Sequence, residues 1–169
     1  PVLTQFNTKI EIWSSIGDHE YLLSVYDHGE TPVPWAAIEQ INNRLLINNI
    51  NKISTTLILE FLQDICDVLH HVHRYGAAYE NLTTESVLYT DQGEVKLRGI
   101  LDQFEEANPW YNAPEEFDGE STERSTVYRI GVITYELLTE TLPYTEYPGG
   151  DPEAAVRDAK LSSLDEQLR

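Results

Sequence analysis

Residues 109–148 constrain the fold more than any other stretch of the chain. They contain the turn Ala113-Pro114-Glu115 and, about ten residues later, an apolar segment over 122–139. Hydrophobic residues recur in this segment at positions 127, 130, 133, 137 and 138. This spacing predicts a helix with one buried face. Ser121 is the expected N-cap, and the helix should end before Pro143 because proline cannot continue a helix.

The composition excludes some partners. The chain has 169 residues, about one domain's length, and a net charge of −18 from 29 acidic and 11 basic residues. Such acidity argues against nucleic acid or an anionic membrane surface as a partner, and it fits a salt-adapted source. We see no signal-peptide pattern and no apolar run near the roughly 18 residues that span a bilayer. The single cysteine, Cys66, fits a reduced cytoplasmic compartment.

Hydrophobic periodicity predicts the other elements. We expect helices over 5–16, 44–50, 54–75 and 153–169, and strands over 22–26, 35–39, 87–89 and 94–98. Residues 100–108 should form an acidic loop. The strands should form two separate pairs within a mainly helical chain, so the predicted fold class is α+β rather than alternating βαβ.

This order of parts resembles a known family. The motifs that carry the resemblance are Leu69-x-x-Val72-His73-x-x-Gly76, Val95-Lys96-Leu97, Ala113-Pro114-Glu115, the helix from Val127 to Thr139, and Pro143-Tyr144. Together they are similar to the mostly helical C-lobe of eukaryotic-type Ser/Thr protein kinases. The resemblance implies a partial N-lobe with hinge over 1–40, made of the family's αC helix and two strands. The C-lobe would cover 41–169 and be truncated at its end. The acidic composition and Pro34-Trp35 before the hinge resemble kinase-like proteins of salt-loving archaea.

The residues that would perform the family's chemistry differ. Kinases need a carboxylate as base, and an Asn and an Asp to hold magnesium. The resemblance places Asn81 at the catalytic Asp, Ser86 at the magnesium Asn, and Gly99 at the Asp of the Asp-Phe-Gly motif. An amide cannot accept the substrate's proton at neutral pH. Lys9 falls at the αC glutamate, although one insertion would bring Glu11 there instead.

Scaffold positions of the family are retained. The resemblance assigns Trp13, Val25, Tyr79 and Ile100 to the regulatory spine. It assigns Ile38, Glu39 and Leu88 to the lining of a nucleotide pocket. It also places Thr126 at the family's helix-anchoring Asp, and it leaves the usual arginine partner of Glu115 unassigned.

Several residues have a functional and a plainer interpretation. Glu80, Glu85 and Asp91 could replace the lost metal ligands, but solvated loop carboxylates are the favoured interpretation. The histidines at 70, 71 and 73 do not share one helix face, so core or capping roles are favoured over a metal site. We expect Cys66 to be an inert core thiol.

The sequence therefore predicts a pseudokinase that acts as a scaffold or allosteric regulator in signalling. It would bind a protein partner and need no metal or other cofactor. The alternative is an active Ser/Thr protein kinase that uses ATP and magnesium with rearranged carboxylates. A third possibility, an unrelated helical binding module, requires that Asn81 and Gly99 do not converge on one cleft.

Overall fold

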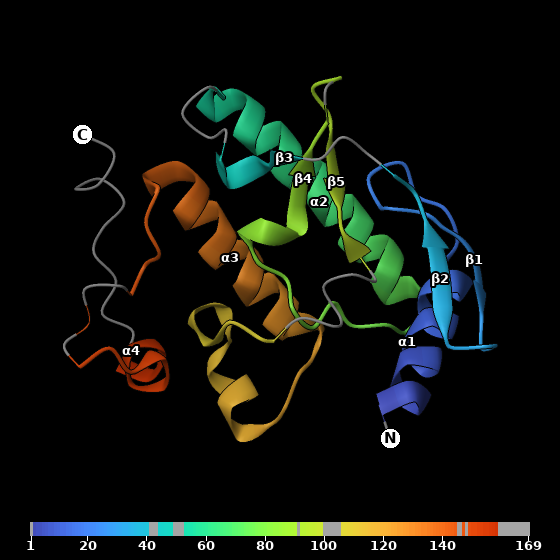
Figure 1. Cartoon of the computed structure of the whole chain (residues 1–169). Helices are drawn as coiled ribbons and strands as arrows, with labels where there is room; N and C mark the ends of the chain where they lie inside the picture. The colour runs from blue at the N-terminus through green and yellow to red at the C-terminus, as the bar shows by residue number, and fades with distance from the viewer. Residues whose placement is uncertain are drawn as a thin grey trace.

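The computed structural model describes residues 2–40, 44–48, 53–90, 92–99, 106–144, 147 and 149–158. Its helices are α1 (Val2–Ile16), α2 (Thr55–Arg74), α3 (Glu123–Thr139) and α4 (Pro152–Asp158). Its strands are β1 (Val25–Gly29), β2 (Trp35–Ile38), β3 (Arg44–Leu45), β4 (Val87–Tyr89) and β5 (Val95–Leu97). Short 3-10 helices are η2 (Thr84–Ser86), η4 (Pro109–Tyr111) and η5 (Pro114–Asp118). Figure 1 shows α1 with β1 and β2 at one end of the molecule and α4 at the other.

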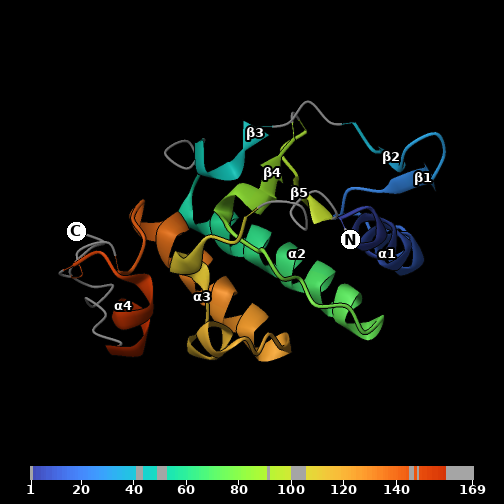
Figure 2. The same ribbon diagram turned by 60° about the horizontal axis from the view of Figure 1, so that its bottom comes forward.

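Helix α2 forms the centre of the core. Its apolar stripe is buried as the periodicity predicts, and consists of Ile58, Phe61, Leu62, Ile65, Val68, Leu69 and Val72. The Ser54 side chain caps its first turn by accepting a hydrogen bond from the Leu57 N–H, and Gly76 follows its end with a φ of 71°. Helix α3 contacts one side of α2 and strand β5 another. Figure 2 shows the small sheet lying over α2.

The strands form two sheets, one of which is larger than predicted. Strands β1 and β2 pair as an antiparallel hairpin, and β3, β4 and β5 form an antiparallel sheet in that order. The helix predicted over 44–50 is wrong in its first part, because Arg44 and Leu45 pair with Tyr89 and Leu88. A 3-10 turn follows over 46–48, and residues 49–52 lie outside the described chain.

The strand predicted over 22–26 begins later. Leu22 and Leu23 are 3% and 4% exposed, and their backbone pairs with Leu97 at the edge of β5 instead of entering the hairpin. The β1 ladder starts only at Val25. The apolar run that suggested a strand is therefore explained by burial in the core beside β5.

Two details of α3 correct the prediction. Its N-cap is Thr122, whose hydroxyl accepts a hydrogen bond from the Arg124 N–H, whereas the Ser121 hydroxyl donates to Glu116. Ile133 and Leu137 are buried, but Val127 is 65% exposed.

The helix predicted over 153–169 is present as α4 up to Asp158, and residues 159–169 lie outside the described part. No helix among the described residues is long and apolar enough to cross a membrane.

Candidate functional site

Tyr79 and Gly99 connect the loop after α2 with the end of β5. The Gly99 N–H donates to the Tyr79 hydroxyl at 2.8 Å. Tyr79 is 1% exposed, and its ring meets that of Trp13 edge-on with centroids 5.4 Å apart. Two of the four predicted spine residues are therefore in contact. Val25 is half-buried against the same core, and Ile100 lies outside the described residues.

Gly99 has no room for a side chain. Its φ is +60°, in the left-handed region that favours glycine. A Cβ atom there would lie 2.9 Å from Leu22 Cδ1 and 3.1 Å from Trp13 Cζ3. Both neighbours are buried, so a carboxylate at this position would require them to move. The position that the resemblance assigns to the second metal ligand is thus closely packed.

Ser86 has a structural role. Its side chain is buried, and its hydroxyl accepts a hydrogen bond from the Thr83 N–H at 2.9 Å. The same hydroxyl donates to the Asn81 carbonyl oxygen at 3.3 Å. These bonds close the turn over 79–86 as a capping box around η2. Asn81 and Ser86 are therefore brought together, and through Tyr79 this turn also meets Gly99.

The turn Ala113-Pro114-Glu115 is hydrogen-bonded to α3. Ala113 is fully buried, and its N–H donates to Glu116 Oε2 at 2.8 Å. Glu115 Oε1 accepts a hydrogen bond from the Ser125 hydroxyl at 2.7 Å. Among the described residues, the partner found for Glu115 is therefore a serine of α3 rather than an arginine.

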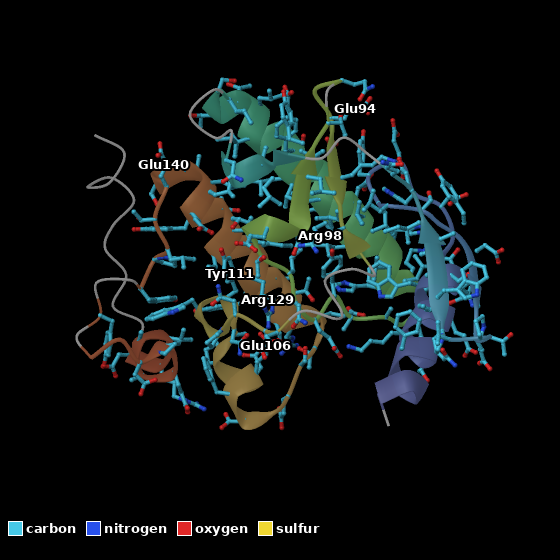
Figure 3. The ribbon with its side chains drawn as sticks, viewed as in Figure 1. Glu94, Arg98, Glu106, Tyr111, Arg129 and Glu140 are labelled. Carbon is cyan, nitrogen blue, oxygen red and sulfur yellow. The ribbon has the colours of Figure 1, made fainter. Side chains whose placement is uncertain are left out.

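Arg129 is the arginine that sequence reasoning missed. It is 2% exposed, and its Nη2 lies 2.9 Å from Glu116 Oε1 and 2.7 Å from Asn112 Oδ1. Its Nε also donates to Glu116 Oε2 at 3.2 Å, which makes the pair bidentate. Figure 3 shows Arg129 close to Tyr111, where the 109–118 segment runs along α3. A charged residue within the apolar pattern of α3 was the available signal.

A second buried network joins three elements. The Tyr111 hydroxyl from η4 donates to Glu136 of α3 in a short hydrogen bond. It also lies 2.9 Å from the Thr84 hydroxyl of η2. Burial, followed by the Glu136 interaction, raises the pKa of Tyr111, which keeps the phenol protonated as a donor. The loop after α2 is thereby linked through η4 to α3.

Lys96 lies beside two of the three predicted nucleotide-pocket residues, Glu39 and Leu88. Leu88 is buried in β4 and lies opposite Lys96 in the sheet, while Ile38 is half-buried at the end of β2. Lys96 Nζ binds both carboxylate oxygens of Glu39 at 2.7 and 2.8 Å. Glu39 also accepts a hydrogen bond from the Ser24 N–H. The carboxylate of Glu39 therefore already has protein partners.

Among the described residues, the remaining candidates form no cluster that could hold a metal ion. Glu80 and Glu85 are exposed, and Asp91 lies outside the described part. No group of three or more His, Cys, Asp or Glu side chains within the described ranges is arranged to hold a metal ion.

The histidines of α2 have separate surroundings. His71 Nε2 lies 3.0 Å from the Ile16 carbonyl oxygen at the end of α1, while His70 is exposed. His73 Nε2 is buried without a hydrogen-bond partner in the described structure.

The expectation of a core thiol was wrong, because Cys66 is exposed on α2.

The αC positions remain a prediction. Lys9 is half-buried and Glu11 is exposed, both on α1. Neither the assignment of Lys9 to the family's glutamate position nor the alternative with Glu11 is tested by these locations.

Curated relatives of the chain are bacterial serine/threonine protein kinases. PknL of Mycobacterium tuberculosis (strain CDC 1551 / Oshkosh) is 28% identical over 178 aligned positions, which cover 95% of this chain and 43% of that protein. PknB of Mycolicibacterium smegmatis is 25% identical over 162 positions, covering 82% of this chain and 25% of that protein. PknB of M. tuberculosis (strain ATCC 25618 / H37Rv) is 24% identical over 151 positions, covering 76% and 24%. The chain thus spans less than half the length of these relatives. No protein-family model matches it.

These similarities support a protein kinase-like family for the chain. The combination of helices with small sheets is consistent with an α+β kinase-like fold.

Magnesium does not fit the residues at the positions that the resemblance assigns to metal binding. This ion prefers oxygen ligands and is usually held by one or two carboxylates. Asn81, Ser86 and Gly99 supply no carboxylate, and the Ser86 hydroxyl is already occupied within its turn.

Proposed function

We propose that the chain is a degenerate protein kinase-like domain that binds another protein instead of transferring phosphate. In this proposal residues 1–40 are a partial N-lobe with hinge, and residues 41–169 are a C-lobe. The domain would act as a scaffold or allosteric regulator in cytoplasmic signalling. Neither nucleic acid nor a membrane surface is a proposed partner, because the net charge of −18 would repel both.

The packing around Gly99 carries this proposal. A lost metal ligand could in principle be regained by one substitution, but here Trp13 and Leu22 occupy the space that its side chain would need. The Tyr79 hydroxyl is also committed to the Gly99 N–H. Ser86 supports the proposal in the same way, because its hydroxyl is already used in hydrogen bonds that close the turn over 79–86.

The hydrogen bonds that hold residues 109–118 against α3 support a retained binding surface. Arg129 and Tyr111 hold this segment on α3 through buried, charge-assisted hydrogen bonds. The Nε and Nη2 atoms of Arg129 fix the segment through Glu116 and Asn112, while its Nη1 is buried without a hydrogen-bond partner among the described residues. A fixed surface is what a scaffold or regulator needs for a protein partner.

Thermal unfolding with nucleotide tests the proposal. A ligand that binds the folded state at 100 times its Kd stabilises it by roughly 2.7 kcal/mol. For a domain of this size that corresponds to a Tm rise of about 5–10 °C. We expect no magnesium-dependent rise when ATP is added with and without Mg²⁺. A reproducible rise of several degrees that disappears with EDTA would contradict the proposal.

One observation favours a second candidate, an active Ser/Thr kinase with rearranged carboxylates. Glu80 and Glu85 flank Asn81 and are both exposed, so either could reach a ligand. Transfer of label from radioactive ATP to a generic protein substrate would support this candidate. Loss of that transfer in Glu80→Gln or Glu85→Gln, with transfer retained in Glu153→Gln on the distant α4, would assign the role.

A further inference from the structure

Two hollows adjoin on the surface of α3. The first, here called the acidic cleft, has a volume of about 760 Å³ and is lined by Glu115, Glu120, Thr122, Glu123, Arg124 and Tyr128. The second, the apolar groove, has a volume of about 400 Å³, and its lining includes Tyr128, Gly131, Thr134, Tyr135, Pro143 and Tyr144. Because Tyr128 contributes to both linings, the cleft and the groove form one continuous surface from the start of α3 to its middle.

The groove offers mainly apolar surface to an occupant. The hydroxyls of Tyr128 and Tyr144 bond each other at 2.6 Å, and the Thr134 hydroxyl donates to the Ile130 carbonyl oxygen at 2.7 Å. These polar groups therefore already have partners. Gly131 is exposed, and a Cβ atom at this position would have nothing within 4 Å. The absence of a side chain lets a second helix approach the backbone of α3 closely.

The cleft carries a net negative charge. Glu115, Glu120 and Glu123 bring three carboxylates to its lining, and Arg124 brings one guanidinium, which leaves a charge of −2. Among the described residues, none of the three carboxylates takes part in an ion pair. Their charge is therefore available to a cationic partner.

Hydrogen bonds hold the walls of the cleft in place. Glu115 Oε1 accepts the Ser125 hydroxyl at 2.7 Å, and the adjacent Glu116 is bound by both Nε and Nη2 of Arg129. The Thr122 hydroxyl caps the start of α3. Because these walls are already ordered, a partner would lose little affinity to their immobilisation.

An amphipathic helix with a basic end complements both hollows. Helices of this kind bind apolar grooves through anchors at i, i+4 and i+7. The distance along α3 from Arg124 to Tyr135 is roughly 16 Å, which three turns of a partner helix can cover. Basic side chains are favourable at the C-terminal end of a helix, where they offset its dipole. With that end at the cleft, the partner helix runs antiparallel to α3.

We propose that α3 binds an amphipathic helix of a protein partner, with its apolar face in the groove and its basic C-terminal turn in the acidic cleft. This inference rests on the proposed function because it names the class of protein partner that the domain would bind. It does not depend on whether phosphate transfer has been lost.

Titration of the 169-residue chain with a designed peptide tests the proposal. The labelled helical peptide has about 16 residues, with leucines at i, i+4 and i+7 and arginines in its last turn. We expect saturable binding by fluorescence anisotropy in 0.1 M KCl. A peptide of the same composition with its leucines spread around the helix should bind at least tenfold more weakly. Equal affinities for the two peptides, or no saturable binding, would overturn the proposal.

A variant of the groove locates the apolar face of the peptide. Gly131→Trp should fill the groove and weaken binding at least tenfold. The matched control is Leu59→Trp, which adds an indole at a 52% exposed position of α2 and should change the affinity less than twofold. Circular dichroism and the Tm check that both variants are folded. An unchanged affinity in folded Gly131→Trp would overturn the proposal.

A charge reversal locates the basic turn. The double variant Glu120→Lys with Glu123→Lys should weaken binding at least tenfold in 0.1 M KCl. Its control, Glu11→Lys with Glu60→Lys, changes the net charge equally at exposed positions on α1 and α2. The control should lose less than threefold, because exposed charges farther than about 10 Å are largely screened at this salt concentration. Equal losses in both double variants would show non-specific attraction and overturn the proposal.

Disulfide trapping tests the direction of the bound helix. In a Cys66→Ser background, Glu120→Cys is oxidised with a peptide that carries a cysteine in its last turn or in its first turn. A disulfide requires Cα atoms about 4.4–6.8 Å apart, so the last-turn peptide should react at least tenfold faster. Equal rates, or a faster reaction of the first-turn peptide, would overturn the proposal.

A second copy of the chain is the alternative occupant of this surface. Sedimentation velocity should show a monomer at the concentrations used for the titration. A dimer that is lost in Gly131→Trp would overturn the proposal in favour of contact between two copies of α3. Magnesium-dependent nucleotide binding would contradict the proposed function without changing the peptide titration, so the two failures are distinguishable.

Discussion

At the scale of single residues, Gly99 matters both for the predicted loss of a metal ligand and for the stability of the fold. The residue stands where the resemblance places a metal-binding aspartate, and its backbone now makes a hydrogen bond to Tyr79 at a φ of +60°. The space of the missing side chain is filled by Trp13 and Leu22. Any side chain added at Gly99 would therefore disturb the core.

We predict that Gly99→Ala destabilises the fold by about 2–4 kcal/mol, from overpacking together with the left-handed backbone. The matched control is Gly76→Ala, at a similar φ of +71° but with nothing within 4 Å of a Cβ atom. It should lose only about 1 kcal/mol, the backbone contribution. Urea unfolding measures both variants. Equal losses would show that the packing around Gly99 does not restrict the side chain.

His19 should give the fold a dependence on pH. Its Nδ1 accepts the Tyr21 N–H at 3.3 Å, and its ring lies 4.9 Å from that of His71. Desolvation and the His71 charge lower its pKa from 6.5, against the opposing effects of Asp67 and Glu20. The unfolded state therefore binds more protons just below pH 6.5. The His19 contribution is fully present above this pH and is lost as the pH falls through the folded-state pKa.

The measurement is the free energy of unfolding between pH 7.5 and 5 for the wild-type chain and for His19→Gln. The carboxylates and other histidines are common to both proteins, so the difference between their slopes reports His19 together with its interaction with His71. The wild-type chain should lose more stability on acidification. Parallel slopes would mean that His19 titrates alike in the folded and unfolded states.

At the scale of elements, the sequence predicts what depends on local spacing. The stripe of α2, its Ser54 cap and its stop at Gly76 follow from residues close together in the chain. Strand β3 could not be found in this way, because two residues become a strand only by pairing with β4. The apolar run at Leu22 and Leu23 was assigned to the wrong partner for the same reason.

The same distinction between local and distant residues applies to the candidate site. The resemblance predicts that Asn81, Ser86 and Gly99 depart from the family, and this prediction concerns residue identity alone. It missed Arg129 and Lys96, whose carboxylate partners are 13 and 57 positions away in the chain. It also could not show that Gly99 is enclosed, because Trp13 and Leu22 come from the other end of the chain.

Tyr111→Phe tests the coupling between η2, η4 and α3. The change removes the hydroxyl that bonds Glu136 and Thr84, and leaves a half-buried carboxylate without that donor. We expect a loss of about 1–3 kcal/mol in unfolding free energy. Tyr26→Phe is the control, because Tyr26 is 68% exposed in β1 and should change little. Hydrogen exchange should also speed up over 109–118, and unchanged protection there would argue against the link.

At the scale of the whole molecule, the net charge of −18 is the dominant property. Acidic side chains crowd each other on the described surface of α2, where Glu60, Asp64 and Asp67 follow at helical spacing near Glu20. The pKa of Asp64 is raised, first by its partial burial and then by these neighbours. The compact state gathers this charge more closely than the unfolded chain, so repulsion opposes folding.

We therefore predict that the Tm of the chain rises by several degrees between 0.1 and 2 M KCl. The Debye length falls from about 10 Å at 0.1 M to about 3 Å at 1 M, which removes most repulsion between exposed carboxylates. A variant with Glu60→Gln and Asp67→Asn should be more stable than the wild type at low salt and should gain less from KCl. A Tm that stays flat or falls with KCl would reject a salt-adapted surface. A rise of equal size in both proteins would instead trace the effect to charges beyond α2.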